Sequence, residues 1–195
     1  MKWLIASDIH GSAHWCRKLL EVFEQEGADR IILLGDILYH GPRNDLPAEY
    51  DPKAVAAMLN EHKNEILCVR GNCEAEVDQM MLQFPVMANY ALLAEGDRII
   101  YMTHGHLPGV QKLLGAESAA AEQGSGLFLK AGDVLLYGHT HVPAWEQKRE
   151  VFCLNPGSVS IPKQDSWHGY MIFENGEFCW KDMDGNVKQG PVRPA

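Results

Sequence analysis

Seven residues with metal-binding side chains stand directly after short apolar segments of this chain. They are two aspartates, one asparagine and four histidines, and they follow five separate segments: Asp8, His10, Asp36, Asn72, His104, His139 and His141. After a single segment, ordinary capping or turn chemistry would explain an aspartate, and core packing would explain a histidine. Five such positions, most of them beside a glycine, are hard to explain in that way. The pattern therefore predicts a metal centre.

The types of these residues indicate the chemistry. Carboxylate, amide oxygen and neutral imidazole suit manganese, iron, zinc or magnesium, and no thiolate is needed. In Asp8-x-His10 and His139-x-His141 the paired side chains would point to the same side if the backbone were extended. Seven donors exceed what one catalytic metal accepts from protein. If one aspartate bridges, they can hold two ions about 3.5–4 Å apart, which would clamp a phosphoryl group and polarise a bridging hydroxide.

The first third of the chain has the pattern of alternating strands and helices. Apolar runs predict strands over 2–7, 31–34 and 66–69, with no alternation, as in parallel strands buried on both faces. Between them we expect a helix from Ser12 to Gly27, with Trp15, Leu19, Val22 and Phe23 on one face, and a helix that begins at Pro52. The polar residues would then lie at the carboxyl ends of the strands, where open α/β sheets bind ligands.

The later part of the chain predicts antiparallel hairpins. We expect hairpins over 90–103 and around Asn175-Gly176, a strand over 134–137, a helix over 116–130 and a frayed tail over 190–195. The expected fold class is α/β, a two-sheet mixed β-sandwich flanked by helices. One sheet would open parallel and the other would finish as antiparallel hairpins. Residues 1–195 are expected to form a single domain.

Composition restricts the classes of protein. The net charge of −9 argues against non-specific nucleic-acid binding, although two bound cations would still admit an anionic phosphate substrate. No apolar run reaches the length of a membrane span. The cysteines are odd in number and form no CxxC pair, which favours reduced thiols and a cytoplasmic protein: Cys16, Cys68, Cys73, Cys153 and Cys179.

In their order, the strings S-D-I-H-G, G-D, R-G-N-C, T-H-G-H and G-H-T-H resemble the calcineurin-like metallophosphoesterase superfamily, and in particular its small bacterial phosphodiesterases. The resemblance runs from Asp8 through Ser158. It implies that Asp8, His10 and His141 bind one metal, that Asn72, His104 and His139 bind a second, and that Asp36 bridges them. It also implies an αββα sandwich and hydrolysis of a small phosphodiester. Manganese is the ion we expect, with iron, nickel, zinc and magnesium as alternatives.

One position departs from the usual superfamily motif G-N-H-[DE], in which the histidine can protonate the leaving group. Here the position is Cys73, followed by Glu74. A cysteine with an ordinary pKa is a poor general acid. We therefore hypothesise a preference for diesters or activated leaving groups over alkyl monoesters. His106 is an alternative acid.

Several assignments stay open. Arg43 and Arg70 are candidates for phosphate contacts, but Arg70 fits a strand-end salt bridge equally well. Residues 155–158, of sequence N-P-G-S, are expected to form a turn that positions the last strands. The main alternative function is a catalytically weak binding scaffold on the same fold. A single-metal hydrolase of another bond, such as an amide, is a third, and a homo-oligomer could form through the exposed hairpin 170–181.

Overall fold

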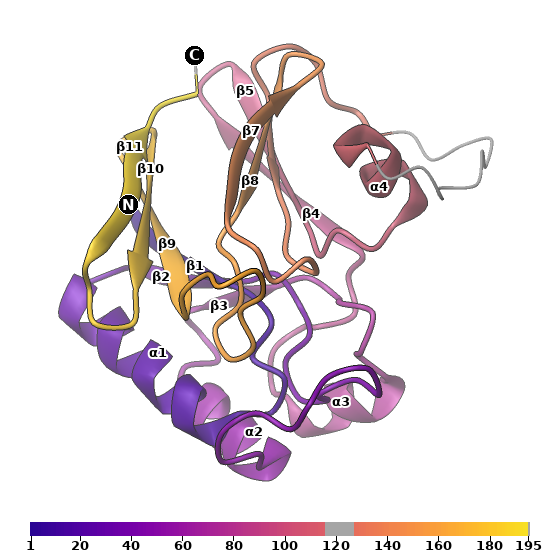
Figure 1. The fold of residues 1–195 in the computed structure, drawn as a ribbon, viewed down its shortest axis with the longest axis vertical. Helices are drawn as coiled ribbons and strands as arrows, with labels where there is room; N and C mark the ends of the chain where they lie inside the picture. Colours follow the sequence, from indigo (N-terminus) through magenta and orange to yellow (C-terminus); the bar gives the residue numbers. More distant parts are fainter. Residues whose placement is uncertain (116–126, 195) are drawn as a thin grey trace.

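The computed structural model describes residues 1–115 and 127–194, and these form two mixed β-sheets (Figure 1). The first sheet has six strands: β1 (Lys2–Ala6), β2 (Arg30–Leu33), β3 (Ile66–Cys68), β9 (Gly169–Glu174), β10 (Glu177–Asp182) and β11 (Val187–Val192). Their spatial order is β11-β10-β9-β1-β2-β3. The second sheet has five strands: β4 (Tyr90–Glu95), β5 (Arg98–Thr103), β6 (Val134–Leu136), β7 (Ala144–Lys148) and β8 (Val151–Asn155). Their order is β4-β5-β6-β8-β7.

Helices cover the outer faces of both sheets. The helices α1 (Ala13–Glu26) and α2 (Pro52–Glu61) pack on the first sheet, α3 (Glu76–Met81) lies near its β3 edge, and α4 (Pro108–Leu114) packs on the second sheet (Figure 1). Apolar residues fill three layers, between α1/α2 and the first sheet, between the sheets, and between the second sheet and α4. The αββα sandwich expected from the sequence is therefore confirmed.

Alternation along the first strands explains this layering. Leu4 and Leu33 face the helices, whereas Ile5 and Ile32 face the second sheet. Both faces of β1 and β2 are buried, as their unbroken apolar runs predicted. The prediction is wrong for β3, where Leu67 is 42% exposed, because β3 is the edge strand and the second sheet does not cover it.

The predicted helix ends have clear local causes. Ser12 caps α1 by accepting a hydrogen bond from the backbone N–H of Trp15, and Gly27 ends it in a left-handed conformation. Asp51 caps α2, which has Pro52 in its first turn. The helix α4 was not predicted. The helix expected over 116–130 lies outside the described residues for 116–126, and residues 127–130 are not helical.

Two expectations about the later strands are wrong. The hairpin β9–β10 does not belong to a second sheet, because β9 pairs antiparallel with β1, where Lys2 lies opposite Glu174. The parallel strands from the start of the chain and the antiparallel strands from its end therefore belong to one sheet. Residues 190–192 are not frayed either, since they lie in β11, where Val192 pairs with Phe178 of β10. Among the described residues, no helix has both the length and the apolar composition needed to cross a membrane.

Candidate metal centre

The seven predicted ligand residues follow the carboxyl ends of five strands. Asp8 and His10 follow β1, Asp36 follows β2, and Asn72 follows β3, three neighbouring parallel strands of the first sheet. His104 follows β5, and His139 and His141 follow β6, parallel neighbours in the second sheet. Parallel neighbours end at the same edge of a sheet, so the two sheets bring both sets of side chains together.

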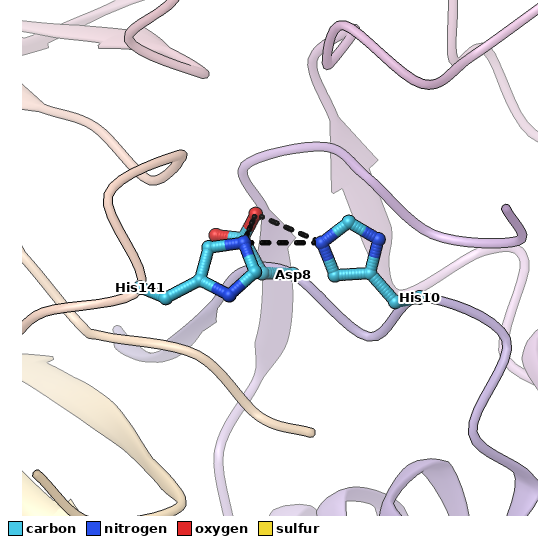
Figure 2. A group of neighbouring side chains, drawn as sticks. All are labelled: Asp8, His10 and His141. Atoms are coloured by element: carbon cyan, nitrogen blue, oxygen red, sulfur yellow. Dashed lines mark hydrogen bonds and ion pairs between the residues drawn. The ribbon is translucent and has the colours of Figure 1, made fainter. Parts of the chain in front are cut away.

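Asp8, His10 and His141 form one compact group (Figure 2). The Nε2 atoms of His10 and His141 are 3.2 Å apart. Asp8 Oδ1 lies 3.5 Å from His10 Nε2 and 3.3 Å from His141 Nε2. Figure 2 shows the three side chains turned toward one another, although His141 comes from the facing sheet. All three are buried.

A second group gathers around His104. Its Nε2 lies 3.3 Å from Asp36 Oδ2 and 3.2 Å from Asn72 Oδ1. Asp36 Oδ2 is also 3.7 Å from His10 Nε2, so this carboxylate lies between the two groups. The ring of His139 lies beside that of His104, with centroids 5.1 Å apart. His139 is not part of the compact histidine, cysteine and carboxylate clusters among the described residues.

Most of these residues have a left-handed backbone, which no sequence pattern predicted. The φ angles are 59° at Asp8, 50° at His10, 55° at Asp36, 68° at His139 and 60° at His141. The expectation of extended Asp8-x-His10 and His139-x-His141 pairs is therefore wrong, because the backbone of each segment turns sharply just after its strand. His139 and His141 consequently lie in different groups. Such conformations persist only where surrounding contacts impose them, and they concentrate at functional sites.

Each aspartate has one oxygen held by backbone and the other directed at histidines. Asp8 Oδ2 accepts a hydrogen bond from the N–H of His139 at 3.0 Å, and Asp36 Oδ1 accepts one from the N–H of Cys73 at 2.8 Å. Asp8 Oδ1 is buried and has no hydrogen-bond partner among the described residues. These backbone hydrogen bonds orient the two carboxylates, so that Asp8 Oδ1 and Asp36 Oδ2 face the histidines and remain free to bind a ligand.

The hydrogen bonds of three histidines are those expected of metal ligands. The Nδ1 atoms of His10, His104 and His141 each lie 2.7 Å from a backbone carbonyl oxygen, which can only accept, so each Nδ1 carries the proton. When such a ring is neutral, its Nε2 presents a lone pair toward the carboxylates and the other histidines. Two Nε2 lone pairs, those of His10 and His141 at 3.2 Å, repel each other unless a proton or a metal cation lies between them. Nδ1–carbonyl contacts of this kind are typical of metal-binding histidines.

The electrostatics of the site favour positive charge beside the two aspartates. Burial lowers the pKa of His104, but the Asp8 and Asp36 carboxylates outweigh it and raise that pKa to about 9. Burial raises the pKa of Asp8, yet the surrounding histidines hold it well below its ordinary value. Burial and the charge of His104 lower the pKa of His139 to about 4, so its ring is a neutral donor. The donor set fits divalent cations.

Two glycines allow the ligand loops to approach one another. A Cβ at Gly71 would overlap the Asp36 carboxylate, and a Cβ at Gly138 would overlap the side chain of Ser7 and lie 2.9 Å from Asp8 Oδ2. Any side chain at either position would push a ligand aspartate out of place. The glycines that stand beside the ligand residues are thus part of the site.

Glu74 supports the site in a way the sequence did not predict. Its carboxylate is 4% exposed and accepts hydrogen bonds from the backbone N–H groups of Asp36, Ile37 and Gly71. It therefore ties the loop after β2 to the loop after β3.

The turn after β8 supports the other ligand loops. Asn155 donates to the carbonyl of Gly138 and to the hydroxyl of Thr140, on either side of His139. Ser158 and Ser160 both donate to the carbonyl of Asp8, at 2.9 and 3.0 Å. The N-P-G-S segment was interpreted only as a turn positioning the last strands, but its hydrogen bonds also hold Asp8 and the 138–140 loop.

A cavity of about 450 Å³ opens over the ligand groups. Asp36, Asn72, Cys73, His139 and His141 line it together with Arg43, Asn44, Thr140 and Lys163. Arg43 and Lys163 bring positive charge to an otherwise acidic protein. Lys163 was not predicted, since it lies outside the motifs, and its backbone N–H donates to the carbonyl of His141 at 3.0 Å.

Arg70 and His106 are not among the residues that line this cavity. Arg70 donates to the backbone carbonyl of Glu74, a contact within its own loop. The ring of His106 lies 5.5 Å from that of His104, and its Nδ1 is buried with no partner among the described residues. Burial, then the charge of His104, lowers the pKa of His106.

A double mixed sheet with helices outside and a buried aspartate–histidine centre at the strand ends defines the metallophosphoesterase fold. Residues 1–177 match the calcineurin-like phosphoesterase superfamily domain, and the chain belongs to that superfamily. Phosphodiesterase YfcE of Escherichia coli K12 is 45% identical over 175 residues, which cover 90% of this chain and 88% of YfcE. The solved structure of YfcE, a phosphoesterase from E. coli, matches with a TM-score of 0.85 and 41% identity over 100% of both chains. Probable metallophosphoesterase YsnB of Bacillus subtilis is 29% identical over 176 residues, 88% of this chain and 83% of YsnB.

Proposed function

We propose that this protein is a phosphodiesterase that uses two divalent metal ions, manganese in the first place, to hydrolyse a small phosphodiester. The observation that carries the proposal is the Asp36 carboxylate, whose Oδ2 lies within 3.7 Å of His10 Nε2 and 3.3 Å of His104 Nε2. A single oxygen that faces both ligand groups is what a bridging ligand requires. Because both sheets supply ligands, we infer one catalytic domain over residues 1–195.

The contacts support the following assignment. Asp8, His10 and His141 would hold one ion, and Asn72, His104 and His139 the other, with Asp36 shared. When bound, two such ions neutralise phosphoryl oxygens and lower the pKa of a water that attacks phosphorus. The protein's own contribution is orientation, because backbone N–H groups and carbonyls fix each carboxylate and imidazole before any ion or substrate binds.

The substrate would bind through the positively charged side chains that line the cavity. Arg43 offers a planar guanidinium that matches two phosphate oxygens, and Lys163 offers a point charge near His141. Arg70, which contacts the carbonyl of Glu74, would instead position the loop that carries Asn72. Two cations around a single phosphate are consistent with a small anionic substrate.

The side chain of Cys73 supports a preference for diesters. Burial raises the pKa of this thiol, and the neighbouring Asp36 carboxylate raises it further. A thiol that stays protonated is a weak acid, so it gives little help to a leaving alkoxide. Esters with a low-pKa leaving group need no such help. The alternative proton donor is His106, whose Nδ1 has no hydrogen-bond partner among the described residues.

The test is to remove metal with a chelator, restore Mn²⁺, and compare hydrolysis of bis-p-nitrophenyl phosphate with that of p-nitrophenyl phosphate. Wild type should need Mn²⁺ and prefer the diester. Asp36→Asn should bind metal and turn over substrate more weakly by roughly 100-fold or more. Asp97→Asn, an exposed aspartate in the β4–β5 turn, is the matched control.

Two outcomes would count against the proposal. Binding of a single ion by wild type, measured by elemental analysis, would exclude the bridged centre. Absence of hydrolysis with any divalent metal, in protein that holds two ions, would favour the alternative of a binding scaffold.

A further inference from the structure

A second, apolar pocket adjoins the metal cavity. It has a volume of about 410 Å³ and is lined by Leu38, Tyr39, Tyr50, Val77 and Met81, among others. Cys73 lines both this pocket and the metal cavity, so its side chain stands at the junction between them. The pocket is within the size range of small-molecule sites, which are mostly apolar with a few polar groups. Its charged lining residues are Lys53 and Asp78.

The apolar side chains around this pocket are unusually open to solvent. Val77 is 58% exposed, Met81 44% and Tyr39 41%. They come from separate segments, the loop after β2 and helix α3, yet they line the same hollow. Single exposed apolar residues are common on proteins, whereas a cluster around a concavity beside a reactive centre is typical of ligand binding.

The walls of the pocket are rigid on the side of the metal centre. Tyr50 packs so closely on Gly11 that a Cβ there would lie 2.6 Å from the tyrosine ring. Backbone hydrogen bonds from Asp51 to Gly11 and from Gly11 to Ile37 tie this segment to the loops that carry His10 and Asp36. This wall of the pocket therefore has a fixed position relative to the ligand groups.

The two hollows on either side of Cys73 differ in the chemistry of their linings. The metal cavity has Arg43 and Lys163 for the anionic part of a ligand, whereas the pocket beyond Cys73 presents aromatic and aliphatic surface. A phosphate with a flat apolar substituent matches both halves at once.

We propose that this pocket binds an aromatic substituent of the substrate, so that the enzyme acts on phosphate esters that carry an aryl or similar planar apolar group. The inference rests on the proposed function for its phosphate site, and it adds the class of organic group attached to the phosphate. Val77 and Met81 would be specificity residues, and they take no part in the chemical step.

The test is direct binding of two phosphonates to the Mn²⁺-loaded protein by calorimetry. Phenylphosphonate and methylphosphonate share the same anion and cannot be hydrolysed, so their Kd ratio isolates the contribution of the ring. Wild type should bind phenylphosphonate roughly tenfold more tightly, the effect of burying about 60 Å² of apolar surface. The double variant Val77→Asn/Met81→Gln should bring the ratio close to one. Met80→Gln is the matched control, because Met80 is 83% exposed on the same helix and does not line the pocket.

A Kd ratio near one in wild type, or an equal ratio in wild type and the double variant, would overturn the proposal. So would a complete lack of binding by both phosphonates. The proposed function is judged separately, by Mn²⁺-dependent hydrolysis of bis-p-nitrophenyl phosphate. If hydrolysis is absent while the tenfold ratio and its loss in the double variant persist, the pocket assignment stands and the catalytic proposal fails.

Discussion

Replacing Glu74 by glutamine tests whether the metal centre depends on the buried carboxylate behind it. Glu74 Oε2 accepts the N–H groups of Asp36 and Gly71, and Oε1 accepts the N–H of Ile37 at 2.7 Å. An amide oxygen can replace one carboxylate oxygen only. In Glu74→Gln, the amide NH₂ would then face the N–H of Ile37. Both groups are donors, so neither would have an acceptor.

The expected cost follows from these bonds. A hydrogen bond to a charged acceptor contributes about 1.5–3 kcal/mol, and a buried donor left unpaired costs about 1–3 kcal/mol. Because the neutral amide is cheaper to bury than a carboxylate, we expect a net loss of about 3 kcal/mol in the free energy of unfolding. For a chain of this length that lowers Tm by roughly 6–12 °C. Metal affinity should fall as well, because the backbone of Asp36 loses a charged acceptor.

The assay is urea unfolding in the presence of a chelator, followed by calorimetric titration with Mn²⁺. Working first without metal separates the effect on folding from the effect on binding. Glu76→Gln is the control, since Glu76 is exposed at the start of α3, and it should change stability by less than about 0.5 kcal/mol. If Glu74→Gln is as stable as this control in the chelator, the account of Glu74 as the link between the two loops is wrong.

Two further predictions concern protons. In metal-free protein the folded-state pKa of His104 is raised to about 9 from an ordinary value of 6.5, so its stabilising contribution is complete below pH 6.5 and is lost as pH rises to 9. We expect the free energy of unfolding of the metal-free protein, measured with urea, to fall by on the order of 3 kcal/mol over that interval. The apparent Mn²⁺ affinity should rise over the same interval, because the ion no longer competes with the proton. A free energy of unfolding that stays flat or increases would contradict this. Cys73→His should add a proton donor beside Asp36 and increase hydrolysis of alkyl phosphate monoesters, for which general acids contribute about 10²–10⁴-fold. An unchanged ratio of monoesterase to diesterase rate would refute the interpretation of Cys73.

Residue types and local patterns predicted much of the site. The apolar runs before Asp8 and Asp36 marked buried parallel strands, and parallel neighbours must end at the same edge of a sheet. The chemistry of the donors predicted a cation, and the structure supports it through the carbonyl contacts of the histidine Nδ1 atoms. Helix ends at Ser12 and Gly27 were predictable because capping depends on adjacent residues alone.

Long-range contacts set the features that the sequence did not predict. The left-handed backbone at Asp8 is held by hydroxyl groups of Ser158 and Ser160, more than one hundred residues away in the chain. Local periodicity cannot indicate such distant partners, so it favoured an extended backbone at Asp8. The same holds for the sheet that β9 joins, since the free edge of β1 exists only once the sheet has formed.

What the sequence determined by itself is the set of donors and the strand ends that carry them, because strand formation and ligand type are properties of short segments. The resemblance to the superfamily also implied how those donors divide into two groups around Asp36. What the tertiary structure alone decided is how Glu74 and Asn155 hold the loops and where an apolar pocket meets the metal cavity. These depend on the distance between side chains from both sheets. That distance follows from the packing of the two sheets across a shared core, which no single segment specifies.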